Sequence, residues 1–174
     1  MKQTDTKGFY QSAMQYGTYL GIYWAVMYIL LFRSLYNPML STIAVAMVFT
    51  SPLLAYRFAI GYRKKECGDQ IKYPQAWTFL FCMYICATLF SALTNYIFFN
   101  FMDQGAFLME FNDILSQLIA TPDIDSATKA QFEGVQDMLS QTTVNGIMWQ
   151  LLNNNIFNSL ILPPIIALFA RKTI

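Results

Sequence analysis

Residues 57–72 read RFAIGYRKKECGDQIK, and this basic stretch decides how the chain folds. It holds five of the eleven basic residues of the protein: Arg57, Arg63, Lys64, Lys65 and Lys72. On each side of it lies a long run without a charged residue. Short loops rich in Lys and Arg remain on the cytoplasmic side of membrane proteins. The stretch therefore predicts a cytoplasmic loop, residues 57–73, between two transmembrane helices.

The composition also indicates an integral membrane protein. Of the 174 residues, 56% are hydrophobic and only 12% are charged, whereas soluble domains carry roughly 25% charged residues. The net charge of +1 argues against nucleic acid as a partner, because such a protein needs a large basic surface. The chain contains no histidine, and we expect neither a metal site nor a cofactor. Three cysteines in an apolar chain predict no disulfide framework.

Four long apolar runs predict four transmembrane helices, at about residues 13–32, 38–57, 75–101 and 146–169. About 20 helical residues cover the hydrocarbon core of a bilayer. We expect the second helix to project beyond the lipid for two or three turns and to end before Gly68, a residue suited to a left-handed conformation. Pro74 suits the first turn of the third helix.

The segment 103–143 differs from the rest because it is acidic. It carries seven carboxylates and a single basic residue, Lys129. Apolar residues three and four apart predict two short amphipathic helices, separated at Thr121-Pro122 and with Asp125 or Ser126 capping the second. These helices would form a lid over the bundle or lie flat on the bilayer. The predicted fold is therefore an all-α polytopic membrane protein: one membrane domain, residues 1–174, with four transmembrane helices and two short helices between the third and the fourth.

The distribution of charge predicts the orientation in the membrane. One arrangement places the N-terminus, the 57–73 loop and the C-terminus on the same side, which gathers nine of the eleven basic residues there: Lys2, Lys7, Arg57, Arg63, Lys64, Lys65, Lys72, Arg171 and Lys172. The positive-inside rule then makes both termini cytoplasmic and the acidic segment extracytoplasmic.

Small residues recur every four positions in the first predicted span, at Gly17, Gly21 and Ala25. Such a stripe lets two helix backbones approach closely. It predicts helix packing, either within the bundle or between two copies of the chain.

Four amides mark a candidate polar groove inside the membrane: Asn95, Gln150, Asn154 and Asn158. The last three fall on one stripe of the fourth predicted span. Because amides in hydrocarbon need hydrogen-bond partners, we expect this stripe to face inward. It would either tie the helices together or line the groove of a small transporter or lipid-handling protein.

Nothing in the sequence points to an enzyme. Apart from Arg57 at the edge of the second span, the four predicted spans contain no Asp, Glu, Lys, Arg or His that could act in acid–base catalysis. We therefore predict no catalytic residue. The favoured hypothesis is a non-catalytic accessory or scaffold protein in which Arg57, Arg63, Lys64, Lys65 and Lys72 contact anionic lipids or a cytoplasmic partner.

The order of these parts resembles a known family. The basic link RFAIGYRKKECGDQIKYPQAW, the end of the third span SALTNYIFFNFMD, the acidic two-helix segment and the polar last helix are similar to the four-span membrane proteins of Bacteroidetes that are classed as a domain of unknown function. The resemblance implies a location in the bacterial inner membrane and assigns no catalytic residue. It also implies a glycosyltransferase acting on lipid-linked sugars as a candidate partner, besides membrane lipids and a homodimer.

Overall fold

The computed structural model describes residues 6–35, 37–103, 105–122 and 124–172. Nearly all of these residues are helical. The elements are α1 (Thr6–Arg33), α2 (Pro38–Glu66), α3 (Tyr73–Ile97), the π-helix η1 (Phe98–Asp103), α4 (Ala106–Ile119), α5 (Ser126–Ser140) and α6 (Val144–Ala170). Within these residues, β-type backbone pairing is limited to one isolated antiparallel bridge between Ile71 and Lys172. The prediction of an all-α chain is confirmed.

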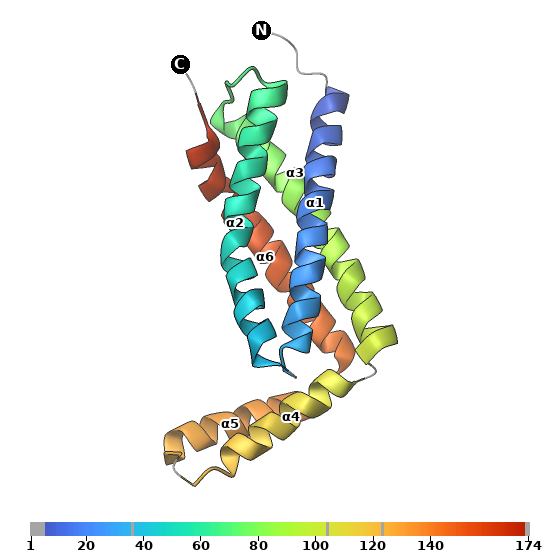
Figure 1. Cartoon of the computed structure of the whole chain (residues 1–174), viewed down its shortest axis with the longest axis vertical. Coiled ribbons are helices and arrows are strands. Elements are labelled where there is room, and N and C mark those ends of the chain that lie inside the picture. Colours follow the sequence, from blue (N-terminus) through green and yellow to red (C-terminus); the bar gives the residue numbers. More distant parts are fainter. Residues whose placement is uncertain (1–5, 36, 104, 123, 173–174) are drawn as a thin grey trace.

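The four long helices lie side by side as a bundle (Figure 1). The most extensive contacts join α1 to α3 and α3 to α6, while α2 packs against α1 and α6. At one end of the bundle, α4 and α5 form a hairpin that extends to one side. The start of α1, the α2–α3 connection and the end of α6 lie at the opposite end. The bundle therefore has two chemically different ends.

Within the described residues, three helices are long and apolar enough to cross a membrane: Met39–Glu66, Tyr73–Asp103 and Val144–Ala170. Helix α1 has 28 residues but is not among them. Its five tyrosines lower its hydropathy. Large apolar side chains are exposed on the outside of the bundle, for example Phe49 (73% exposed) and Phe157 (61% exposed). Such a surface suits lipid better than water.

The start and end signals of the helices lie where the sequence predicts them. Helix α2 continues to Glu66, which confirms the predicted extension past residue 57. The backbone then becomes left-handed at Gly68, with φ of 62°. The amides of Cys67 and Asp69 both donate to the carbonyl oxygen of Arg63 (3.2 and 3.0 Å), closing the last turn. Pro74 lies in the first turn of α3, as expected.

The third long helix does not remain α-helical to residue 101 as predicted. It changes to a π-helix at Phe98 and continues to Asp103. In the wider turn both Phe98 and Phe99 are buried, with ring centroids 4.7 and 4.8 Å from that of Phe32 on α1. Successive residues of an α-helix point about 100° apart, which makes it difficult to bury two adjacent rings against the same neighbour. The wider turn of the π-helix allows both rings to be buried near Phe32.

The acidic segment forms two helices, α4 and α5, at the predicted positions. Asp103 accepts hydrogen bonds from the backbone amides of Gly105 and Phe107 (3.2 and 3.0 Å), where α4 begins. The Asp125 side chain caps α5 by accepting from the amide of Thr128 (3.1 Å). The Gln136 amide of α5 donates to Asn112 and Ser116 of α4 and joins the hairpin. One of the seven carboxylates of the segment, Asp123, lies outside the described residues.

Candidate functional site

The end of the bundle opposite the hairpin is basic. Three chain segments meet there: the start of α1, the α2–α3 connection and the end of α6. They contribute the exposed basic residues Lys7, Lys64, Lys65, Lys72, Arg171 and Lys172. We call this surface the basic end. Arg57 is also exposed but lies on the side of α2, nine residues before its last residue. Lys2 lies outside the described residues.

The opposite end carries the negative charge. Hairpin α4–α5 exposes four carboxylates, Asp113, Asp125, Glu133 and Asp137, and Glu110 is half-buried. The long dimension of the bundle separates them from the basic end (Figure 1). The described basic and acidic residues therefore gather mainly at opposite ends of the bundle, and in membrane proteins it is the bias of Lys and Arg that sets the orientation.

Arg63 differs from the other basic residues of the 57–73 segment because its charge is used within the fold. Its Nε donates to Asp69 Oδ1 (3.0 Å) and its Nη1 to the carbonyl oxygen of Ala170 (2.8 Å). Lys172 pairs with the other oxygen of Asp69, and its backbone exchanges two hydrogen bonds with Ile71 (3.1 and 3.2 Å). We call this set the C-terminal clamp. It fastens the end of α6 to the α2–α3 connection.

The contacts of the clamp change the pKa of Asp69. The hydrogen bond from Lys172, together with that from Arg63, lowers the pKa of Asp69 below its ordinary value. Because this pKa is lowered, the ionised Asp69 stabilises the folded protein fully above the unfolded-state pKa of about 3.9. That contribution to stability is lost as the pH falls through the folded-state pKa. In an NMR titration of the Asp69 carboxyl carbon, we therefore expect a midpoint below that of an unfolded aspartate.

Two matched variants test the cause of this shift. Lys172→Gln should move the midpoint of Asp69 upward, towards the ordinary value, because it removes the positive charge of the Lys172 donor, which has the largest effect on this pKa. Lys64→Gln removes an exposed charge outside the clamp and should leave the midpoint nearly unchanged. Equal midpoints in Lys172→Gln and in the unchanged protein would contradict the assignment.

The remaining basic residues are accessible to partners. Lys64, Lys65 and Lys72 are all exposed. Lys64 and Lys65 lie in the last turn of α2, where positive charge also complements the helix dipole. Of the predicted basic contact residues, these three lysines are exposed at the basic end and Arg57 is exposed on the side of α2, whereas Arg63 belongs to the clamp.

A buried polar network joins α1, α3 and α6 in the centre of the bundle. The Tyr28 hydroxyl donates to Asn155 Oδ1 (2.7 Å), and Asn155 Nδ2 donates to Ser91 Oγ (3.0 Å). Ser159 Oγ donates to the backbone oxygen of Asn155 (2.7 Å) and lies 3.0 Å from Thr88 Oγ1. The two polar residues that α6 turns inward are therefore Asn155 and Ser159, which sequence reasoning did not select.

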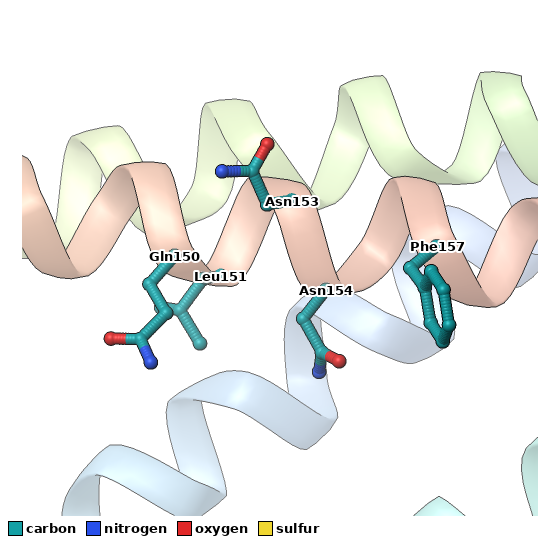
Figure 2. A pocket seen from close by; sticks show the side chains of 5 residues that line it. All are labelled: Gln150, Leu151, Asn153, Asn154 and Phe157. Carbon is teal, nitrogen blue, oxygen red and sulfur yellow. The ribbon is translucent and has the colours of Figure 1, made fainter.

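The hollow that contains Gln150 and Asn154 does not include the other two predicted groove residues, Asn95 and Asn158. Asn95 is buried, Asn158 is half-buried, and Gln150 and Asn154 are exposed on the outer face of α6. This placement differs from the inward orientation expected for the stripe. The two exposed amides help to line an open hollow together with Leu151, Asn153 and Phe157, and Figure 2 shows Gln150, Asn154 and Phe157 projecting to the same side of the helix while Asn153 points the other way.

The small residues of α1 face α3. A Cβ atom added at Gly17 would lie 2.6 Å from Cys86 Cβ, and one added at Gly21 would lie 2.6 Å from Phe90 Cβ. Ala25, the third residue of the stripe, is half-buried. Since α3 occupies the surface around Gly17 and Gly21, this part of the stripe packs within the bundle and is not available to a second copy.

Comparison with known proteins gives a family without an assigned activity. A family described as a protein of unknown function matches residues 15–172, a range that includes most of α1, all of α2 to α6 and the clamp residues. No curated protein and no solved structure matches the chain.

Proposed function

This chain belongs to the DUF4199 family of proteins of unknown function, and on that premise we propose that it is a four-span protein of the bacterial cytoplasmic membrane with a non-catalytic accessory role. Helix α1 is the fourth span. Two observations support this: α1 packs along α3 within the bundle, and its outward side chains include Ile22, Val26 and Ile29, all exposed. An exposed apolar stripe on a bundle helix is stable where lipid covers it.

The basic end lies on the cytoplasmic side in this proposal, with both termini, and the α4–α5 hairpin lies outside the membrane on the other side. The separation of basic and acidic residues to the two ends of the bundle supports this orientation. Because the hairpin carries exposed charge at the extracytoplasmic end, it lies at the membrane surface or beyond it and not within the hydrocarbon.

The accessory role rests on one observation: Lys64, Lys65 and Lys72 are exposed together at the basic end. Each Lys near an anionic membrane surface contributes about 1 kcal/mol of binding free energy. The three lysines can thus hold anionic headgroups around the end of α2, or recognise an acidic surface of a membrane-bound partner such as a glycosyltransferase. The protein would then organise lipid or partner without reacting with either.

The lysines are tested by neutralising two of them. We expect the double variant Lys64→Gln, Lys65→Gln to bind anionic lipid roughly 30-fold more weakly, since about 2 kcal/mol of attraction is removed. The measurement is the number of phosphatidylglycerol molecules that remain bound, by native mass spectrometry, when the protein is taken from nanodiscs of mixed phosphatidylglycerol and phosphatidylcholine.

Lys129→Gln is the matched control, because Lys129 is an exposed lysine on the hairpin and its loss should not change the bound lipid. Orientation is checked separately in intact cells, with a membrane-impermeant thiol reagent on Lys129→Cys in a background with Cys67, Cys82 and Cys86 replaced by alanine. If both lipid binding and the co-purification of a partner are unchanged in the double variant, with normal insertion, the basic end is removed from the proposal. If lipid binding is unchanged but a partner no longer co-purifies, the surface recognises protein.

The alternative function, a small transporter or lipid-handling protein, has less support. It requires Asn95 to share a cavity with the amides of α6, but the hollow at Gln150 and Asn154 does not include Asn95, and Asn95 is only 3% exposed. The accessory role uses residues that the fold leaves at the surface and needs no such cavity.

A further inference from the structure

The outer face of α6 presents amides that the chain itself does not satisfy. In the described residues, the side chains of Gln150 and Asn154 are exposed and form no hydrogen bond with another part of the protein. Both belong to a helix, Val144–Ala170, that is apolar enough to cross a membrane. Asn154 comes ten residues after Val144, which is about 15 Å along the helix axis. At that depth an amide facing lipid lacks a partner.

Among the exposed residues of α6, one set that contains two amides follows the spacing of a helix-packing seam. Gln150, Asn154, Phe157 and Ile161 are all exposed and are separated by four, three and four residues. Alternation of three and four residues is the a/d pattern of helices that pack at about 20° in a left-handed pair. The seam lies on the side of α6 opposite Asn155 and Ser159, and Figure 2 shows three of its members projecting together. We call these four residues the α6 seam.

The chemistry of the seam favours one particular occupant. An amide is both a hydrogen-bond donor and an acceptor, so two identical amides can pair with each other. The α6 seam contains no charged residue that would require a partner of opposite charge. Two copies inserted in the same orientation place every residue at the same depth. A polar Asn at a core position of a parallel helix pair is also the residue type that fixes register.

We propose that a second copy of this chain packs in parallel along the α6 seam, with the Asn154 side chain hydrogen-bonded to Asn154 of the partner subunit across a two-fold axis. Gln150 pairs in the same way nearer the hairpin end of the helix. Phe157 and Ile161 supply the apolar contact below the amides. The inference is independent of the role of the basic end, because it uses a different surface.

Disulfide cross-linking in native membranes tests the face that is used. In a background with Cys67, Cys82 and Cys86 replaced by alanine, Ile161→Cys should give a disulfide-linked dimer under mild oxidation. Leu160→Cys should not, although Leu160 is more exposed (55% against 42%), because it lies off the seam. Both substitutions are on the outer face and spare the buried network. Equal yields at the two positions, or none at position 161, would overturn the proposal.

The amides are tested by measuring dimerisation directly. Energy transfer between labelled copies is followed while the protein is diluted in lipid. Asn154→Leu should weaken association roughly 3- to 20-fold, the range of an interhelical hydrogen bond in membranes. Asn153→Leu removes a neighbouring exposed amide that points away from the seam and should leave association unchanged. A protein that stays monomeric at every dilution contradicts the inference, as does equal weakening by both variants.

Discussion

Gly17→Leu is expected to prevent α1 from packing on α3 and to lower the stability of the bundle more than any other single change considered for this protein. A Cβ at position 17 alone would lie 2.6 Å from Cys86 Cβ and 2.7 Å from the backbone oxygen of Met83. The second contact is with main chain, which cannot move unless α3 itself moves. Overpacking of this kind costs about 1–3 kcal/mol, or more when backbones must separate. The loss is measured as the free energy of unfolding in lipid, by steric trapping.

The matched control lies on the same helix. Gly8 has no atom within 4 Å of the place where its Cβ would be, so Gly8→Ala should be neutral or should stabilise α1 by up to about 1 kcal/mol. A Gly17→Leu variant as stable as Gly8→Ala would show that α1 and α3 are not in contact at this point. Gly17→Ala should fall between the two.

The second large effect is expected at Asn155. Replacing it with leucine removes the acceptor of Tyr28 and the donor to Ser91, two hydrogen bonds of 2.7 and 3.0 Å between three helices. Two buried hydroxyls then lose a partner, and we expect the free energy of unfolding to fall by about 1–3 kcal/mol. The measurement is again the unfolding free energy of the protein in lipid, at a dilution where each copy is alone.

Asn154 supplies the matched variant, since it is the neighbouring residue and the same amide. Because its side chain is exposed, Asn154→Leu should change the unfolding free energy of a single copy by no more than about 0.5 kcal/mol. If Asn154→Leu were the more damaging of the two, α6 would be rotated about its axis relative to the structure. Comparing Asn154→Leu with Asn155→Leu therefore tests the orientation of α6 as well as the strength of the polar network.

The helices and their ends could be predicted because the signals are local. Gly68 allows the left-handed backbone after α2, Pro74 suits the first turn of α3, and Asp125 caps α5. Each of these effects acts within a turn of the residue that causes it. The change to a π-helix at Phe98 has no such signal. It depends on burial of Phe98 and Phe99 against Phe32 on another helix.

The rotation of α6 about its axis could not be read from its amides. Amides occur on both sides of this helix, at Asn154 on the outside and Asn155 on the inside, so polarity alone does not distinguish the two faces. The inward face is instead marked by small residues below Asn155: Ser159, Ala167 and Ala170 are all buried. Small residues allow close helix contact, and that is the signal that would have identified the inward stripe.

The role of Arg63 in the clamp could not be predicted from the sequence for a different reason. Its partners are Asp69, six residues away, and the carbonyl of Ala170, 107 residues away. A charge pattern shows that Arg63 belongs to a basic segment, but only the meeting of two distant segments shows that its charge is used within the fold. Lys64 and Lys65 have no such partner in the described residues and are exposed, so they remain candidates for the predicted basic contact surface.

The polar network has a consequence for the order in which the protein is made. Its hydrogen bonds reach from α6 back across 64 residues to Ser91, 71 to Thr88 and 127 to Tyr28. Because the chain is synthesised from its N-terminus, α1, α2 and α3 are complete well before α6. Until then, the hydroxyls of Tyr28, Thr88 and Ser91 lack the partners that α6 supplies. The polar network is therefore completed late, and a chain interrupted before Asn155 lacks all three of these contacts.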